Sequence, residues 1–288
     1  MSTVNNVRLT GPEINFGVLK GLIGTWQGAN GFNMISVPDQ KGEFTLIIAP
    51  YTETLTVNAV PATTPNRGLI VIENIPTLQY ATTIRDSRDG SLMHVECGFW
   101  ELLEFSTRNA GFDIFRIASV PHGDAVEAMG NSFVTPGPPV IDTSLSGVPS
   151  GDLPPLAGYL DPFGFPFEFK DFDPASPNMT LVNYLKAQEE AGWTVTNTVT
   201  LSVSTQNKGG ISNIASLQTN ANPTEFDAIF WLETLEDGKG NTLQQLQYSQ
   251  RIMIDFPVSV DMSGQTIQWP HINVNTLTLT EPGTIPAY

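Results

Sequence analysis

Residue types that carry much of enzyme chemistry are scarce in this chain of 288 residues. It contains one cysteine, Cys97, and three histidines. A single cysteine excludes an internal disulfide and every metal site built from several thiolates. The first sixteen residues, MSTVNNVRLTGPEINF, hold no basic patch that leads into an apolar stretch. This pattern predicts no secretory signal, so we expect a cytoplasmic protein in a reducing compartment.

Basic residues and long apolar runs are also few. Lys and Arg number 13 against 29 Asp and Glu, which gives a net charge of −16. Such a surface repels phosphate backbones and anionic lipids, so we expect neither nucleic acid nor a membrane as partner. No apolar run approaches the ~20 residues of a membrane span. With 40% hydrophobic and 15% charged residues, the composition is typical of a folded globular protein.

Common catalytic motifs are missing as well. The sequence contains no G-x-S-x-G elbow, no P-loop, no G-x-G-x-x-G after a strand and no H-E-x-x-H. Their absence disfavours the commonest hydrolase, nucleotide-binding and zinc chemistries.

The sequence is rich in alternating apolar and polar residues, which is typical of strands with one buried face. Turn signals at Asp89-Gly90, Asn109-Ala110-Gly111, Lys208-Gly209-Gly210 and Asp237-Gly238 join successive strands. We predict an all-β fold, an antiparallel up-and-down barrel of about ten strands, in preference to a sandwich, because closure removes exposed edges. Strands are expected over 43–49, 51–58, 77–85, 91–104, 111–119, 124–130, 194–204, 211–220, 225–236, 244–256 and 266–280.

Residues 131–192 lack the alternating apolar and polar pattern and are expected to form an insertion within a single domain of residues 1–288. The segment is rich in Pro and Gly, and its end predicts one helix that Ser176 caps, Pro177 begins and Gly192 ends. Phenylalanines recur at spacing two at Phe163, Phe165, Phe167 and Phe169. This stripe must cover something: the barrel wall, the barrel mouth as a lid, or a second copy in a homodimer.

The three histidines have different settings. His94 shares a strand face with Glu96 and Trp100. This arrangement allows a shared proton, but the interpretation we favour is a hydrogen-bonded structural pair inside the barrel. His122 lies between Pro121 and Gly123 and is expected in a surface turn. His271 follows Pro270 at the start of the last apolar strand, where it is either a core histidine or a ligand.

Two other features lead to local predictions. The acidic cluster of Glu233, Glu236 and Asp237 is interpreted as a solvated turn. The apolar phase of the last strand shifts between Val274 and Leu277, which predicts a β-bulge there.

Several segments, in order, resemble the nitrobindin-like haem-binding β-barrels, which are similar in shape to fatty-acid-binding proteins and lipocalins and occur as the C-terminal domain of some THAP proteins. These segments are FGVLKGLIGTWQG, PYTETLTV, LQYATTI with DGSLMHVECGFWEL, IASVPHGDAVEAMG, and LQYSQRIMI with PHINVNTLTL. They span about residues 14–130 and 193–280. The resemblance implies haem b as cofactor, His271 as the ligand of its iron, and Trp26 in the opening strand near the pocket. It also implies nitric oxide binding and peroxynitrite isomerisation, or a weak haem peroxidase activity.

The chain departs from the family pattern in its opening motif. Asn30 stands where the last glycine of G-x-W-x-G-x-G is expected. A threonine expected near the open face of the haem has no match, and Met34 or Ser36 is the nearest substitute. These departures favour an alternative, a non-catalytic carrier of a fatty acid, tetrapyrrole or other hydrophobic molecule. A third reading is a structural module that docks a partner through the phenylalanine stripe.

Overall fold

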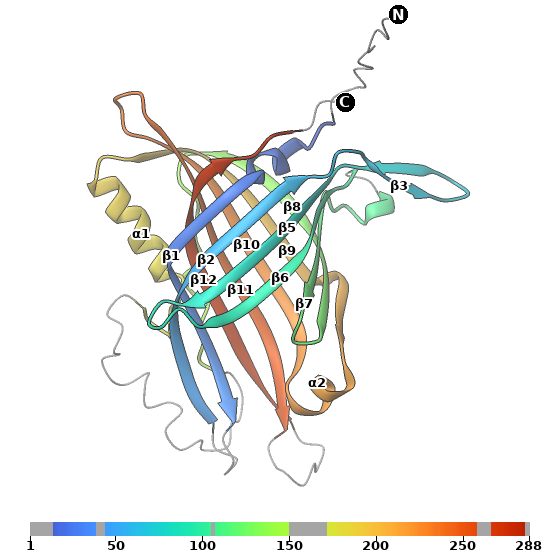
Figure 1. Cartoon of the computed structure of the whole chain (residues 1–288), viewed down its shortest axis with the longest axis vertical. Helices are drawn as coiled ribbons and strands as arrows, with labels where there is room; N and C mark the ends of the chain where they lie inside the picture. Colours follow the sequence, from blue (N-terminus) through green and yellow to red (C-terminus); the bar gives the residue numbers. More distant parts are fainter. Residues whose placement is uncertain (1–13, 39–43, 105–106, 150–171, 258–265, 286–288) are drawn as a thin grey trace, which may run out of the picture.

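The computed structural model describes residues 14–38, 44–104, 107–149 and 172–285. Ten antiparallel strands close into a barrel in the order β1-β12-β11-β10-β9-β8-β7-β6-β5-β2, which confirms the predicted fold class (Figure 1). Each strand pairs with its neighbour in sequence except where β3 and β4 form a separate ribbon between β2 and β5. The barrel therefore leaves no open sheet edge.

The barrel strands are long, and short helices accompany them. The barrel strands are β1 Gly24–Pro38, β2 Phe44–Ala59, β5 Thr77–Asp86, β6 Leu92–Leu102, β7 Ile114–Val120, β8 Asp124–Pro136, β9 Thr194–Asn213, β10 Asn222–Glu236, β11 Thr242–Pro257 and β12 Thr266–Pro282. The ribbon strands are β3 Thr64–Arg67 and β4 Ile72–Ile75. The helices are η1 Gly17–Leu22, η2 Thr107–Asn109, α1 Met179–Glu190 and α2 Ala215–Asn220. None of these helices, in the ranges that the structure describes, is long and apolar enough to cross a membrane.

The predicted turns at Asp89-Gly90 and Asp237-Gly238 join β5 to β6 and β10 to β11. Gly90 and Gly238 adopt φ values of 75° and 68°, a region that favours glycine. The expected strands 43–49 and 51–58 are one continuous strand, β2. Pro50 is tolerated within it because β2 pairs with β5 only from Tyr51 onward.

The predicted hairpin at Lys208-Gly209-Gly210 is wrong, because β9 continues through it to Asn213. Four residues of β9, 205–208, bulge away from β8 between the pairs Met129↔Ser204 and Ala128↔Gly209. At Gly209 a Cβ atom would lie 1.9 Å from the carbonyl oxygen of Glu127, so the close approach of the two strands requires glycine. The strand expected over 211–220 is also wrong, since Ala215–Asn220 form α2.

A one-residue bulge lies in β1, where Gly28 pairs with Glu53 but Gly31 pairs with Tyr51. Side chains alternate along a strand, so the extra residue exchanges the inner and outer faces of β1 beyond the bulge. The bulge predicted in β12 between Val274 and Leu277 is wrong, because this stretch pairs with β11 without a register shift and the extra residue opposite it lies in β1. The extra residue of β12 against β1 comes later, between Leu279 and Glu281. The apolar phase of β12 changes because Val274 faces outward into a second core, whereas Leu277 faces into the barrel.

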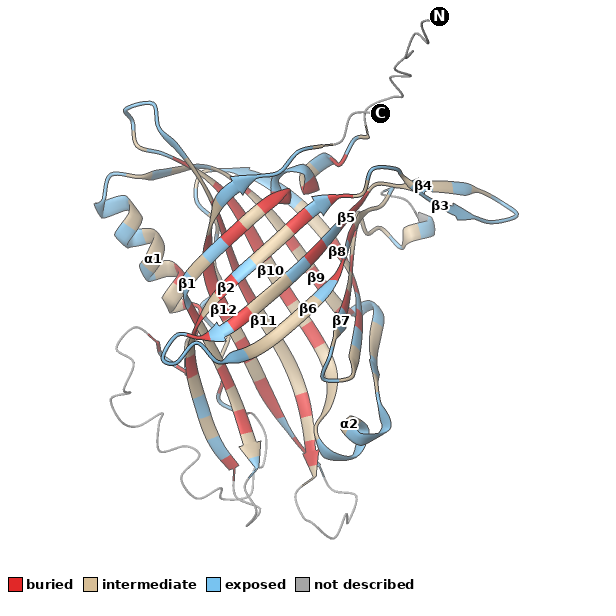
Figure 2. Cartoon of the chain, in the orientation of Figure 1, coloured by how far each residue is buried: buried red, intermediate tan, exposed pale blue. Residues whose placement is uncertain are grey.

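The main core fills one end of the barrel, where η1 packs Leu19 and Leu22 against the interior. Figure 2 shows buried residues alternating with less buried ones along the strands, as expected for a wall with an inner and an outer face. A second core lies outside the wall, beneath α1 and the segment before it. It contains the buried residues Met34, Phe172, Leu181, Trp231, Ile272 and Val274.

The insertion begins after Pro136 rather than at residue 131, because β8 extends that far. The predicted helix is present as α1, against the outer face beside β12 (Figure 1). Its N-cap is Asn178, and the Ser176 hydroxyl instead donates to the carbonyl oxygen of Thr143. Gly192 follows the helix end with φ of 90°, as predicted. The phenylalanine stripe from Phe163 to Phe169 lies outside the described residues.

Glu233 is fully buried, so its assignment to a solvated acidic turn is wrong. Its side chain lies on the outer face of β10, and its carboxylate accepts a hydrogen bond of 2.6 Å from Gln245. The Gln188 side chain of α1 reaches Gln245 in turn, at 3.5 Å. Glu236, three residues further along, is exposed as expected.

Candidate functional site: a cavity at the open end of the barrel

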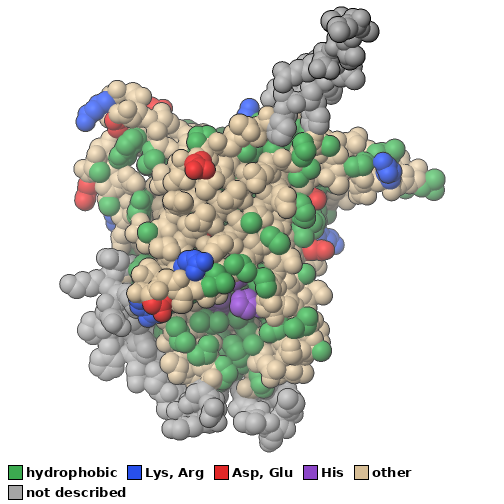
Figure 3. Space-filling view, viewed as in Figure 1, with side chains coloured by type: hydrophobic (Ala, Val, Ile, Leu, Met, Phe, Trp, Pro, Cys, Tyr) green, Lys and Arg blue, Asp and Glu red, His purple; other side chains and the backbone are tan. Residues whose placement is uncertain are grey.

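A cavity of about 420 Å³ occupies the barrel interior at the end away from η1. This volume lies in the usual range for small-ligand sites. All three histidines line the cavity, although they are far apart in sequence. Figure 3 shows histidine surface within a hydrophobic hollow in the lower half of the molecule. Most other wall residues are apolar: Ile35, Leu55, Ile84, Met93, Trp100, Ala118, Val120, Val126, Ile211, Leu217, Ala221, Pro223, Phe226, Phe230, Ile252 and Ile254.

His271 projects into the cavity from β12 and is fixed by an amide from β1. Its Nε2 lies 2.6 Å from Oδ1 of Asn33. The amide nitrogen of Asn273 also faces Nε2, at 3.5 Å. The shorter contact is to an oxygen that only accepts, which favours the tautomer with the proton on Nε2 and the lone pair on Nδ1. Burial, followed by the nearby His94 and His122, lowers the pKa of His271 to about 4. The imidazole is therefore neutral at physiological pH, the form in which it binds metals.

His94 and His122 lie together on another part of the wall. Their rings stack with centroids 5.7 Å apart. His94 comes from β6, and its Nε2 lies 3.5 Å from Oε2 of Glu96. His122 is an exposed residue of the β7–β8 turn, as expected, but it also lines the cavity. The turn thus brings to the cavity a histidine that sequence reasoning left at the surface.

A buried ion pair lies beyond the histidines. The Arg116 guanidinium donates a hydrogen bond of 2.5 Å to Oε1 of Glu96, and the Tyr80 hydroxyl donates to the same carboxylate. Burial alone would raise the pKa of Glu96, but Arg116, His94 and Tyr80 outweigh it and lower that pKa to about 2. The guanidinium lies 5.1–5.8 Å from the ring centroids of Tyr80, Trp100, Phe226 and Phe230. Arg116 is thus held as a cation among aromatic rings.

A second buried carboxylate, Glu53, lines the same part of the cavity. It accepts hydrogen bonds from Tyr248 at 2.6 Å, Thr82 at 2.8 Å and Asn275 at 2.9 Å. Burial raises the pKa of Glu53, and these three neutral donors only partly offset the effect. Tyr248 also shares a hydrogen bond of 2.7 Å with Tyr51.

The structure places the other predicted pocket residues away from the cavity. Trp26 is buried in the main core, where its indole N–H donates to the carbonyl oxygen of Leu22. Met34 lies in the outer core beneath α1, and Ser36 is likewise buried without lining the cavity. The bulge explains this outcome: Met34 would share the inner face with Trp26 if β1 alternated without interruption, but the extra residue turns it outward.

Sequence reasoning missed three residues that shape the site: Asn33, Glu53 and Arg116. The sequence contains a signal for two of them, a charged residue that alternates with apolar residues. Glu53 alternates with apolar residues on the inner face of β2, and Arg116 does so between Ile114 and Ala118 on β7. A charged residue on an apolar face is a candidate for a buried site. Asn33 carried no such signal, because only the bulge turns it inward.

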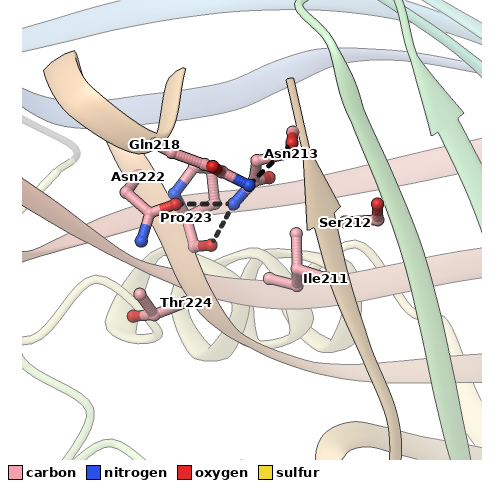
Figure 4. A pocket seen from close by; sticks show the side chains of 7 residues that line it. All are labelled: Ile211, Ser212, Asn213, Gln218, Asn222, Pro223 and Thr224. Atoms are coloured by element: carbon pink, nitrogen blue, oxygen red, sulfur yellow. Dashed lines mark hydrogen bonds between the residues drawn. The ribbon is translucent and has the colours of Figure 1, made fainter. Parts of the chain in front are cut away.

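A second hollow, of about 530 Å³, lies outside the barrel between β9, α2 and β10. It is shallow and polar, and Figure 4 shows that its amides bind one another. The Asn213 amide donates to Asn222 and to the carbonyl oxygen of Pro223, both at 2.8 Å, and Gln218 donates to the backbone of Asn213. These bonds hold α2 beside the cavity mouth, to which Leu217 of α2 and Ala221, the residue after α2, both contribute.

Comparisons with known proteins add no argument about function. No protein-family model and no curated protein matches the chain. Among solved structures, the chain is similar to that described as "Crystal Structure of Rv2717c from M. tuberculosis". The identity is 14% and the TM-score 0.44, over 91% of this chain and 97% of the other. We therefore infer function from the cavity itself.

Proposed function

We propose that the cavity binds haem b and that His271 is the protein ligand of its iron. The observation that carries this proposal is a neutral imidazole, with one nitrogen lone pair, on the wall of an apolar cavity. Neutral imidazole is a common axial ligand of haem iron, and apolar walls suit a flat macrocycle.

The metal-binding side chains of the cavity suit an iron atom whose other ligands come from a porphyrin. Within the described ranges, no group of three or more His, Cys, Asp or Glu residues is placed to hold a metal ion. A bare ion at His271 would thus lack protein ligands, whereas haem iron needs only one or two. The hydrogen bond from Nε2 to Asn33 would fix the ring and make Nδ1 a better donor, as outer-shell acceptors do.

A histidine-ligated haem with an open position supplies binding and redox chemistry on small nitrogen and oxygen species. The resemblance to nitrobindin-like barrels makes nitric oxide binding and peroxynitrite isomerisation the specific expectation. In this chain, His94 and His122 would contribute polar N–H groups to the same cavity, while the apolar wall would limit water. Asn33 would hold the His271 ring in place.

Reconstitution of the purified protein with haem tests the ligand assignment. The Soret band of His271→Ala is expected to shift and its haem affinity to fall, because the iron loses its protein ligand. Glu127→Gln is the control, since it changes an exposed residue of the outer wall and leaves the cavity lining intact, and its Soret position should stay that of the wild type. A His271→Ala spectrum identical to wild type would exclude this residue as the ligand. Stopped-flow decay of peroxynitrite on the ferric protein then tests for catalysis.

A second candidate function is a carrier of a hydrophobic molecule without an iron bond. The observation that favours it is the enclosed apolar wall, which suits any hydrophobic molecule of matching size. Native mass spectrometry of freshly isolated protein distinguishes the two functions. An added lipid-sized mass without haem supports the carrier, and a haem mass that dissociates more readily from His271→Ala supports the first proposal.

A further inference from the structure

The inner end of the cavity holds a carboxylate that has no cationic partner. Glu53 is 6% exposed, and that exposure faces the cavity it lines. Its hydrogen bonds come from Tyr248, Thr82 and Asn275, all neutral donors. Within the part of the chain that the structure describes, Glu53 forms no ion pair.

Arg116, a cation on the same wall, already forms an ion pair with another carboxylate. It pairs with Glu96 and lies among four aromatic rings. His94 also lies against Glu96, at 3.5 Å, rather than against Glu53. The inner end therefore holds one more carboxyl group than it holds guanidinium groups to balance it, in a region shielded from water.

A buried carboxylate without a counter-charge is costly, and a cation beside it removes much of that cost. An ionised carboxylate offers about four acceptor positions, and three of those on Glu53 are filled. One acceptor position therefore remains for a group that enters through the cavity. The raised pKa of Glu53 is consistent with a site that lacks its cation.

A ligand must pass along the cavity wall to reach Glu53, so the residues of this wall limit the chemistry of its remaining part. The pair Tyr248↔Asn275 lies four residues along β11 and β12 from the pair Ile252↔His271, or roughly 13 Å deeper in the barrel. The wall around that path is apolar, with Ile254, Ile252 and Phe226 among its residues. A ligand that reaches Glu53 must therefore have an apolar body and a polar group at its leading end.

We propose that this inner end binds the ammonium group of a hydrophobic amine, with the Glu53 carboxylate as its acceptor. A carboxylic acid of the same length is disfavoured, because its headgroup would meet Glu53 and Glu96 in a low-dielectric site. The proposal names a ligand class that does not depend on haem.

Calorimetric titration of the haem-free protein with decylammonium chloride and with sodium decanoate, both below their micellar concentrations, tests this inference. One decylammonium per chain is expected to bind about tenfold or more tightly than decanoate, since hydrogen bonds to charged groups are among the stronger ones. Glu53→Gln should lose at least that factor for decylammonium. Glu127→Gln, which removes an exposed carboxylate from the outer wall, should bind as the wild type does. This control accounts for attraction of the amine to the acidic surface.

A second variant, Leu55→Trp, tests the location if Glu53→Gln does not fold. It fills the cavity beside β2 and should abolish decylammonium binding while leaving Glu53 in place. Equal or tighter binding of decanoate by the wild type, or wild-type amine affinity in either cavity variant, would overturn the proposal. Because no haem is present, a protein that binds decylammonium but not haem refutes only the haem proposal, and the converse result refutes only this one.

Discussion

The burial of Glu233 predicts that the protein loses stability as pH rises through the neutral range. Burial raises the pKa of this carboxyl to about 8, and the hydrogen bond from Gln245 only partly opposes the shift. In the unfolded chain the pKa returns to about 4.3. Between these two values the folded state holds a proton that the unfolded state releases, so the free energy of unfolding falls with increasing pH.

The size of this effect follows from the two pKa values. The stabilisation is fully present below the unfolded pKa and is lost as pH rises through the folded pKa. Each pH unit between them is worth about 1.4 kcal/mol, so a rise from about pH 5.5 to about pH 8.5 removes roughly 3 kcal/mol. Glu233→Gln cannot ionise, and its side-chain oxygen can still accept the bond from Gln245. The variant should lose about 3 kcal/mol less than the wild type over the same interval.

Urea unfolding followed by tryptophan fluorescence at the two pH values measures this difference. Glu236→Gln is the matched control, because Glu236 is exposed on the same strand, and it should follow the wild type. Parallel loss of stability in the wild type and Glu233→Gln would refute the assignment of a buried, protonated carboxyl beneath α1.

Four further outcomes are expected. Asn33→Leu should weaken haem binding and shift the Soret band in a haem titration, because the His271 ring loses its hydrogen-bond acceptor. An unchanged haem affinity would contradict this role of Asn33. Since the pKa of His271 without haem is about 4, the haem affinity from titrations at each pH should stay constant down to about pH 5 and begin to fall only below about pH 4. An affinity that already falls below pH 6.5 would contradict the burial of the ring. Leu181→Ala should lower the free energy of unfolding in urea by about 2–5 kcal/mol, because this fully buried side chain anchors α1. A change under about 1 kcal/mol would show that α1 is not packed there. Gly209→Ala should lower the melting temperature measured by circular dichroism, because its Cβ would meet the Glu127 carbonyl at φ of 111°; an unaltered melting temperature would argue against the bulge.

The class of fold could be predicted from local patterns in the sequence. Alternating residues in segments such as 194–204 and 244–256 require one buried face, and glycines at Gly90 and Gly238 supply the φ values that tight hairpins need. These signals are local, since they depend on neighbouring residues and backbone geometry. The antiparallel strand class and most of the hairpins follow from them, with the segment around Gly209 as the exception.

Which side chains meet in the cavity depends on long-range contacts. The extra residue in β1 reverses its two faces, so Asn33 points inward and Met34 outward, and nothing local in the sequence fixes that parity. The cover provided by α1 buries Glu233 on a face that alternation alone assigns to solvent. Register and cover depend on contacts between segments distant in the chain, and these same contacts bring His94, His122 and His271 to one cavity.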